Sequence, residues 1–152
     1  MIIRTRVVRI ESMRYRTVGD WYYTNDATQG GPVLNIDVAD TGNAKYNFLV
    51  VQHEINEALL CDVMGITQTE VDNFDKNWER WGDEGEPGCA NESPYCKQHM
   101  LAFATEIAAA DALGVDWNLY EQCLDELLVA YDKAHPKPIP FKTKEKSDLP
   151  TT

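Results

Sequence analysis

One stretch of the chain, residues 45–64, decides the fold; its sequence is KYNFLVVQHEINEALLCDVM. At 100° per residue, its apolar side chains cover nearly the whole circumference of a helix, and such a helix is expected inside a domain. His53 and Glu57 lie in the middle of one apolar face. Their burial is costly without a partner, and a divalent metal ion is the partner that fits an imidazole and a carboxylate best.

The overall composition is that of one globular domain. The chain has 152 residues, of which 43% are apolar and 10% aromatic, and a domain of this length buries roughly two thirds of its unfolded surface. The formal net charge of −11 argues against a nucleic-acid partner, because binding to phosphate backbones depends on clustered lysines and arginines. An acidic mimic of DNA is the less favoured alternative, since excess carboxylate more often keeps a protein soluble.

Membrane association and disulfide bonding are not expected. No stretch approaches the roughly 20 apolar residues of a membrane span, and the N-terminal sequence MIIRTR lacks the long apolar run of a signal peptide. We therefore expect a cytoplasmic protein. In a reducing compartment its cysteines are expected to be free thiols or metal ligands. They are Cys61, Cys89, Cys96 and Cys123.

The N-terminal quarter is predicted to form a small sheet. Three segments with the composition of strands, 1–10, 15–23 and 32–38, are separated by turn sequences that contain Gly, Asn and Asp. Short strands at this spacing favour a mainly antiparallel sheet.

The remainder is predicted to be helical. The helix over residues 45–64 is expected to end at Gly65 with a left-handed cap, and Thr67 with Glu70 forms a capping box for the next helix. That second helix carries Trp81, and residues 82–92 then form a flexible acidic loop. Two more helices are expected, over residues 94–113 after an N-cap at Ser93 and over residues 117–135 after one at Asp116.

These elements predict the fold class and the domain boundaries. We expect an α+β fold in which a small antiparallel sheet packs on about four helices. A single domain is predicted over residues 1–135, followed by an extended tail rich in Pro and Lys over residues 136–152.

His53, Glu54 and Glu57 suggest a hydrolytic metal site. Residues i and i+4 lie side by side on a helix, so His53 and Glu57 can bind one ion together. Glu54 lies about 100° further round the same turn, from which it can take a proton from a water molecule that the ion activates. The spacing is that of the His-Glu-x-x-His helix, with a carboxylate in place of the second imidazole.

The third ligand must come from another element, because a hydrolytic zinc site usually has three protein ligands. His99 is the best candidate, since it shares the inward face of the helix over residues 94–113 with apolar side chains. His135 precedes the tail and is expected to be exposed. The sequence therefore predicts His53, Glu57 and His99 as the ligand set.

Two further carboxylates are candidates for supporting roles. Glu106 lies on the same face as His99 but about 10 Å further along the helix axis. One ion could hardly bind both, so we expect Glu106 to support a ligand or to pair with a buried base, Arg14 or Arg16. Asp75, on the intervening helix, is a reserve ligand.

Two other interpretations of these residues remain open. Buried His and Glu side chains are often satisfied by hydrogen bonds within a core, without any metal. Alternatively, a structural zinc ion could be held by Cys89, Cys96 and His99 together with Cys61. Cys96 and His99 are one helical turn apart, but the gap between Cys89 and Cys96 is wider than is typical of zinc knuckles.

The segment HEINEAL, residues 53–59, resembles the His-Glu-x-x-Glu-Ala helix of small phage and prophage proteins thought to be zincin-like metallopeptidases. The resemblance covers about residues 50–120. Its other motifs are Gly65-Ile66, Val71-Asp72-Asn73-Phe74-Asp75, Glu86-Pro87-Gly88, Pro94-Tyr95 with His99, and Leu113-Gly114-Val115-Asp116-Trp117.

The resemblance implies a zincin-like order of strands, then an active helix, then a helix that carries another ligand. It implies Zn²⁺ as cofactor, with His53, Glu57 and His99 as its ligands and Glu54 as general base. The implied function is zinc-dependent hydrolysis of a peptide or protein substrate by a phage-encoded or prophage-encoded enzyme in the host cytoplasm.

A rival enzymatic function uses the carboxylates differently. Glu54-x-x-Glu57 and Asp72-x-x-Asp75 are similar in spacing to the paired carboxylates of all-helical, Mg²⁺-dependent nucleotide pyrophosphatases. That interpretation leaves His53 and the strands without a role.

A non-enzymatic function is the other rival. A phage assembly or host-interaction module, with or without a metal site, could use the acidic surface, the pair Trp78 and Trp81, and the Pro-rich tail. Aromatic residues at that spacing are more often core than interface, but Trp81 borders the acidic loop.

Overall fold

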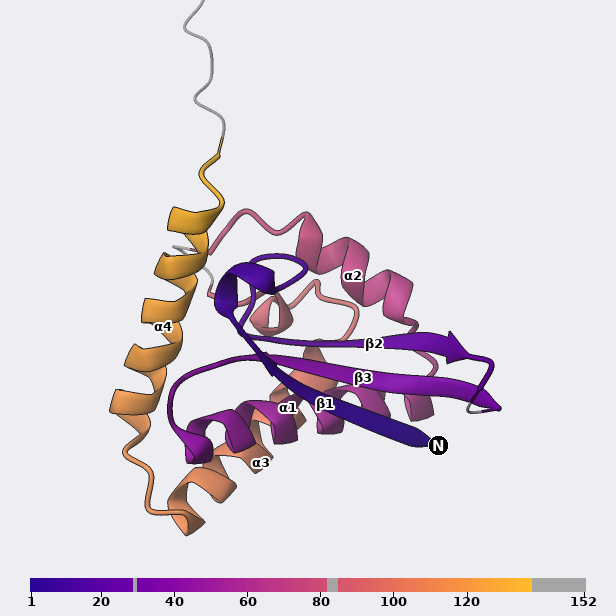
Figure 1. Ribbon diagram of the computed structural model, residues 1–152, viewed down its shortest axis with the longest axis horizontal. Helices are drawn as coiled ribbons and strands as arrows, with labels where there is room; N and C mark the ends of the chain where they lie inside the picture. Colours follow the sequence, from indigo (N-terminus) through magenta and orange to yellow (C-terminus); the bar gives the residue numbers. More distant parts are fainter. Residues whose placement is uncertain (29, 82–84, 138–152) are drawn as a thin grey trace, which may run out of the picture.

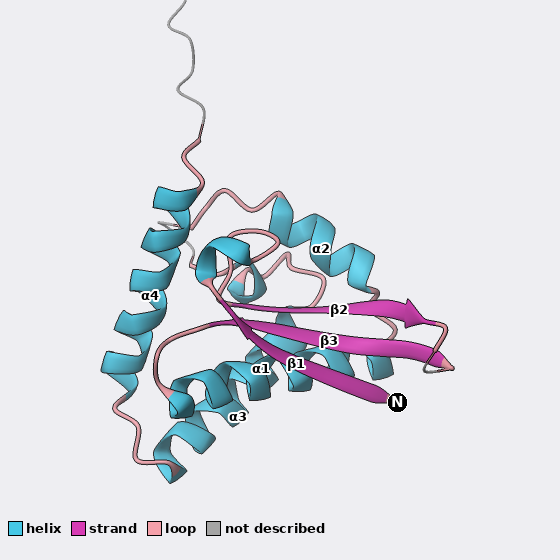
Figure 2. Cartoon of the chain, viewed as in Figure 1, coloured by secondary structure: helices cyan, strands magenta, loops and turns pink. Residues whose placement is uncertain are grey.

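The computed structural model describes residues 1–28, 30–81 and 85–137, which form a three-stranded sheet and four α-helices (Figures 1 and 2). The predicted α+β class is confirmed. The strands are β1 (Ile2–Val8), β2 (Gly19–Asp26) and β3 (Gly31–Ala39). The helices are α1 (Ala44–Met64), α2 (Gln68–Lys76), α3 (Cys96–Ala112) and α4 (Trp117–Ala134), with 3-10 turns at η1 (Ile10–Ser12) and η2 (Pro87–Cys89).

The sheet is mixed, with strand order β1-β3-β2. β2 and β3 form the expected antiparallel pair, but β1 runs parallel to β3, so the prediction of antiparallel pairing was wrong for this strand. Burial explains the strand order. β3 is the most buried strand, and Leu34, Ile36 and Val38 are completely buried. It therefore takes the central position, while the largely exposed β1 lies at the edge.

The main core surrounds α1, which packs against β2, β3 and α3. Figure 1 shows α1 running along one face of the sheet. Leu49 and Ala58 of α1 are completely buried, and His53 and Glu57 are buried beside them. The prediction that α1 is buried nearly all round was wrong, because Phe48 is 52% exposed and Val63 80% exposed. The sheet and α3 cover only part of the helix surface, and its remaining side faces solvent.

The helix ends follow the predicted chemistry in most places. Gly65 has φ 74° in a left-handed cap, and the N–H of Ile66 donates to the carbonyl of Cys61. The capping box of Thr67 and Glu70 is confirmed, and the Asp116 side chain accepts from the N–H of Leu119.

Two helix boundaries differ from prediction. α2 ends at Lys76 rather than near Trp81. α3 begins at Cys96 rather than Pro94, because the hydroxyl of Ser93 accepts from the N–H of Tyr95 in a turn before the helix. α4 ends close to the predicted position, and residues 138–152 of the predicted tail lie outside the described residues. No described helix has both the length and the apolar character that a membrane crossing requires.

A buried ion pair joins the segment before β2 to the sheet. Asp20 is 2% exposed, and the guanidinium of Arg14 donates to its two oxygens over 2.6 and 2.8 Å. Replacing Arg14 with Met leaves that carboxylate without its cation, and we expect the free energy of unfolding to fall by about 3 kcal/mol. Urea denaturation measures the change.

The control is Arg4→Met. Arg4 faces Asp26 at 3.7 Å with its side chain 47% exposed, so this change is expected to cost less than about 0.5 kcal/mol. Equal losses in the two variants would contradict the importance of the buried pair.

Candidate metal centre

Three side chains from two helices converge in the interior. His53 and Glu57 project from α1 and His99 projects from α3, and all three are buried. Nε2 of His53 lies 3.2 Å from Nδ1 of His99. The Oε2 atom of Glu57 lies 2.9 Å from that Nδ1 and 3.5 Å from that Nε2. The structure therefore brings together the three residues that the sequence singled out.

The separations among these atoms match those of a metal-binding site. Zinc binds imidazole nitrogen and carboxylate oxygen at about 2.0–2.2 Å in tetrahedral geometry, which places neighbouring ligand atoms about 3.3 Å apart. The three observed separations range from 2.9 to 3.5 Å. Two nitrogens and one oxygen are also a common ligand set of catalytic zinc. The residues present therefore fit a zinc ion.

The outward-facing atoms of His53 and Glu57 have partners of their own. Nδ1 of His53 lies 2.8 Å from Oε2 of Glu106, whose other oxygen accepts a hydrogen bond from the Tyr120 hydroxyl. The indole N–H of Trp21 donates to Oε1 of Glu57 over 2.9 Å. A proton on Nδ1 of His53 leaves the Nε2 lone pair directed at the other two ligands. Glu106 thus contacts His53, a predicted ligand, which matches the first of the two roles considered for it, and it has no ion pair with Arg14 or Arg16.

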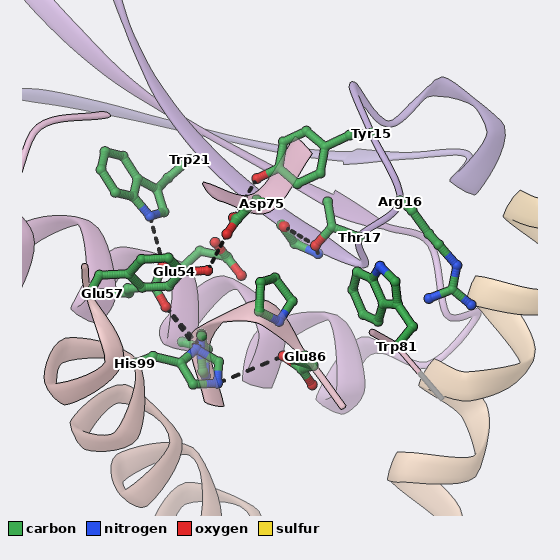
Figure 3. A pocket seen from close by; sticks show the side chains of 15 residues that line it. Tyr15, Arg16, Thr17, Trp21, Glu54, Glu57, Asp75, Trp81, Glu86 and His99 are labelled. Carbon is green, nitrogen blue, oxygen red and sulfur yellow. Dashed lines mark hydrogen bonds and ion pairs between the residues drawn. The ribbon is translucent and has the colours of Figure 1, made fainter. Parts of the chain in front are cut away.

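Figure 3 shows how the other end of this network continues. The dashed lines run from Trp21 through Glu57 to His99 and on to Glu86. Nε2 of His99 lies 3.8 Å from a Glu86 oxygen and 3.5 Å from the sulfur of Cys89. Both Glu86 and Cys89 are exposed, so this end of the site faces solvent.

The pKa values show that the cluster holds protons when no ion is present. Burial opposes charge on all three side chains, but their hydrogen bonds to one another, to Glu106 and to Cys89 outweigh its effect on their pKa values. The pKa of Glu57 is lowered to about 2 by contacts with His53 and His99. The pKa of His99 is raised to about 10 by hydrogen bonds to Cys89 and Glu57, and that of His53 is raised well above its ordinary value. Metal binding would displace these protons.

Glu54 lies beside the cluster without a hydrogen-bond partner among the described residues. Burial, together with the charge of Glu57, raises its pKa well above the ordinary value. It lines two small cavities, of about 40 and 70 Å³, that both reach His53. A water molecule needs roughly 10–15 Å³ of such space. Each cavity therefore has room for water next to the Glu54 carboxylate.

Two glycines give the site its space. A Cβ atom at Gly19 would lie 2.3 Å from Oε1 of Glu54, and one at Gly88 would lie 2.4 Å from Cγ of His99. Gly88 belongs to η2, where Pro87 and Gly88 are both buried. The prediction of a flexible acidic loop over residues 82–92 was therefore wrong for this turn, because it packs against the imidazole of His99. Residues 82–84 lie outside the described residues.

Asp75, the reserve ligand, is held away from the cluster. It accepts hydrogen bonds from the hydroxyls of Tyr95 over 2.6 Å and Tyr15 over 3.2 Å. Burial raises its pKa to about 7 against the effect of these phenols, and the charge of Glu57 adds to the rise. Asp75 lines the smaller cavity but does not belong to the group of converging ligand atoms.

The alternative zinc site built on cysteines does not form. Within the described part of the chain, His53, Glu57 and His99 are the one group of three or more residues whose ligand atoms converge. Cys89 contacts the far side of His99, whereas Cys61 is buried in α1 and Cys96 starts α3. The predicted set of Cys61, Cys89, Cys96 and His99 is therefore not assembled.

Four residues important to the site were not found from the sequence. They are Gly19, Trp21, Gly88 and Tyr120. The sequence offers a signal for Gly88 alone, because Glu86-Pro87-Gly88 is one of the motifs quoted for the family resemblance. The contacts of Trp21 and Tyr120 span 36 and 14 residues of sequence, and no local pattern marks such pairs.

Comparisons of the chain with protein-family models, curated proteins and solved structures found no match. The resemblance to zincin-like phage proteins, and the host-cytoplasm location that it implies, therefore stay predictions from the quoted motifs.

The close contact at Gly88 gives a test of site geometry. Alanine at this position would push the His99 ring away from Glu57, so we expect Gly88→Ala to destabilise the protein by about 1–3 kcal/mol. We also expect it to weaken zinc binding about tenfold or more. Thermal unfolding and competitive zinc titration measure the two effects.

The matched control is Gly31→Ala, where an added Cβ has nothing within 4 Å. This variant is expected to keep its zinc affinity and to lose no stability. Wild-type zinc affinity in Gly88→Ala would show that the position of the His99 ring does not matter.

The raised pKa of Asp75 predicts a pH effect on stability in the metal-free protein. Between about pH 4 and pH 7 the folded state holds a proton that the unfolded state has lost, so stability falls as pH rises through this range. Asp75→Asn keeps one oxygen, which can accept from one of the two tyrosines, and removes the titration. The quantity to compare is the free energy of unfolding of the variant minus that of wild type. We expect this difference to be about 1–3 kcal/mol larger at pH 8 than at pH 4. Urea denaturation with a chelator present measures this difference, and a constant offset at the two pH values would refute the assignment.

Proposed function

We propose that the protein is a zinc-dependent hydrolase that cleaves peptide bonds. The observation that carries the proposal is the convergence of two imidazole nitrogens and one carboxylate oxygen at separations of 2.9 to 3.5 Å. The supporting feature is Glu54, a carboxylate with no hydrogen-bond partner among the described residues, which lines the cavities beside His53. The peptide substrate comes from the resemblance to zincin-like proteins.

The chain's own residues divide the work of such a reaction. His53, Glu57 and His99 would hold the ion, while Glu106 fixes the orientation of His53 and Trp21 that of Glu57. Zinc in such a site acts as a Lewis acid on a carbonyl and makes a nearby water molecule more acidic. Glu54 would accept the proton of the attacking water and pass it to the leaving amine, because its carboxylate lines both cavities beside His53.

The rival magnesium chemistry gains no support from the second carboxylate pair. Asp72 binds the guanidinium of Arg14 and the ammonium of Lys76, and Asp75 binds two phenols. Neither lies in the group of converging ligands. The non-catalytic alternative keeps only part of its proposed surface, since Trp78 is 8% exposed and its indole N–H donates to the carbonyl of Gly85.

One observation favours a second candidate function. The sulfur of Cys89 lies 3.5 Å from Nε2 of His99, and the Nδ1 atom of the same ring lies 2.9 Å from Glu57. A nucleophile, an imidazole and an orienting carboxylate stand in this order in thiol-dependent acyl transfer. In that case Cys89 would attack the carbonyl while His99 takes the thiol proton and passes it to the leaving amine, and water would then hydrolyse the thioester, without any metal ion.

Substitutions at the cluster test the proposed zinc chemistry. We expect the purified wild type and Glu54→Gln to retain zinc, whereas His53→Ala and His99→Ala lose it, because each removes one of three ligands. Hydrolysis of a fluorogenic peptide library is expected to disappear in all three variants, and Glu106→Gln is expected to weaken zinc binding by about 10-fold to 100-fold. Elemental analysis and initial rates give the two measurements.

Cys89→Ala separates the two candidate functions. Zinc chemistry predicts hydrolysis in this variant and its loss on chelation. Hydrolysis that survives chelation but disappears with Cys89→Ala or after alkylation would replace zinc chemistry by thiol chemistry. Wild-type protein that binds no zinc at neutral pH would rule out the proposal.

A further inference from the structure

The candidate metal centre opens into a larger groove on the side of α4. The two small cavities at His53 and a third cavity of about 500 Å³ share Thr17 and Glu86 in their walls. The phenyl ring of Phe103 stacks on the imidazole of His99 and lines the two cavities nearer α4. The groove therefore adjoins the small cavities that contain the cluster.

The floor of the groove is apolar. Its side chains come from three parts of the chain: the segment before β2, α3 and α4. They are Val18, Phe103, Leu124, Leu128 and Val129. Val129 is 50% exposed, so this part of the groove is open to solvent. The groove thus suits a large apolar side chain.

The rim of the groove is acidic. Glu86, Glu121 and Asp125 line it, and the described residues offer Glu121 and Asp125 no ion pair. Among the described residues of this wall the one cation is Arg16, which is already engaged by Asp132 over 2.8 and 3.0 Å and lies against the ring of Trp81. An occupant with a basic group would therefore meet an uncompensated negative rim.

We propose that this groove binds the substrate: an extended peptide segment in which a large apolar residue is next to a lysine or arginine. The apolar side chain lies on Phe103 and Leu128, and the basic side chain faces Glu86, Glu121 and Asp125. This substrate class rests on the proposed function, because the groove adjoins the candidate metal centre. It is tested by binding alone, so the two proposals can fail separately.

The experiment measures binding of fluorescent peptides to Glu54→Gln protein, once with zinc and once with a chelator. Three short Ala/Ser peptides are compared, with a central Phe-Lys, Phe-Glu or Ala-Lys pair. We expect the Phe-Lys peptide to bind about fivefold more tightly than Phe-Glu and about tenfold or more tightly than Ala-Lys. The order is expected both with zinc and with chelator, because the groove does not require the ion.

A matched pair of charge reversals on α4 locates the binding surface. Asp125→Lys changes a rim residue, whereas Glu126→Lys changes its neighbour, which lines none of the cavities and accepts from Gln122. We expect Asp125→Lys to make the protein bind Phe-Glu more tightly than Phe-Lys. Glu126→Lys is expected to leave the ratio of the two affinities within twofold of its value in Glu54→Gln protein. Both positions are exposed, so neither change is expected to unfold the protein.

Three results would overturn the proposal. The first is equal binding of the three peptides. The second is an equal response to the two charge reversals. The third is binding that strengthens about tenfold when residues 138–152 are deleted, which would identify the chain's own segment, with Ile139, Phe141 and several lysines, as the occupant. Peptide binding that follows the predicted order in a protein that does not hydrolyse peptides would keep the groove and remove the enzymatic proposal.

Discussion

The buried contact between Glu57 and His99 is the interaction on which the rest of the structure depends. It joins α1 to α3, and a chain of polar contacts extends from it in both directions. One direction passes through Trp21 to β2, and the other passes through His53 and Glu106 to Tyr120 on α4. Every buried charge in this series of contacts has a partner, which is the condition for keeping such groups inside a core. The candidate ligands thus belong to the same network that joins α1 to α3, β2 and α4. A change in one ligand is therefore expected to affect both the site and the stability of the fold.

The two ends of this network differ. At the His53 end, the outer ring nitrogen faces Glu106, which is 5% exposed and held by Tyr120. At the His99 end, the outer ring nitrogen faces the exposed residues Glu86 and Cys89. The proposed ion and substrate would therefore enter from the η2 side, where Glu86 and Cys89 also line the groove beside α4. The closed end fixes the geometry, and the open end gives access.

Much of the site follows from helical periodicity. The i and i+4 spacing placed His53 and Glu57 on one face, and the apolar neighbours of His99 in α3 placed it on an inward face. If the two helices face each other, these positions predict that His53, Glu57 and His99 converge, and this triad is what the structure contains. Periodicity does not say how many neighbours a helix has, so Phe48 and Val63 of α1 are exposed where burial was expected. It also carries no information about strand partners, which is why the parallel pairing of β1 with β3 was missed.

The parts that could not be predicted share a physical cause, since each is a relation between distant segments. Trp21 supports Glu57 from β2, and Tyr120 supports Glu106 from α4; no spacing rule connects them. Gly19 and Gly88 matter because they lack a side chain, and this becomes visible only when Glu54 and His99 occupy the space beside them. Capping motifs, in contrast, involve neighbours in sequence, so Gly65, Thr67 and Asp116 were predicted correctly.

Hydrogen bonds within a core would give separations similar to those in the triad, so the choice between a metal site and a satisfied core depends on Glu54. A core network would be complete without it: Glu57, His53, His99 and Glu106 already have partners. Glu54 instead keeps a half-buried carboxylate, without a hydrogen bond to any described residue, at the wall of two cavities, and Gly19 leaves it the room. Folding gains nothing from that arrangement, because it costs desolvation and pairs no charge. The proposed exchange of a proton with a small molecule in the cavity would account for this arrangement, and the three converging side chains beside the cavity are the candidate ligands of the ion that such chemistry requires.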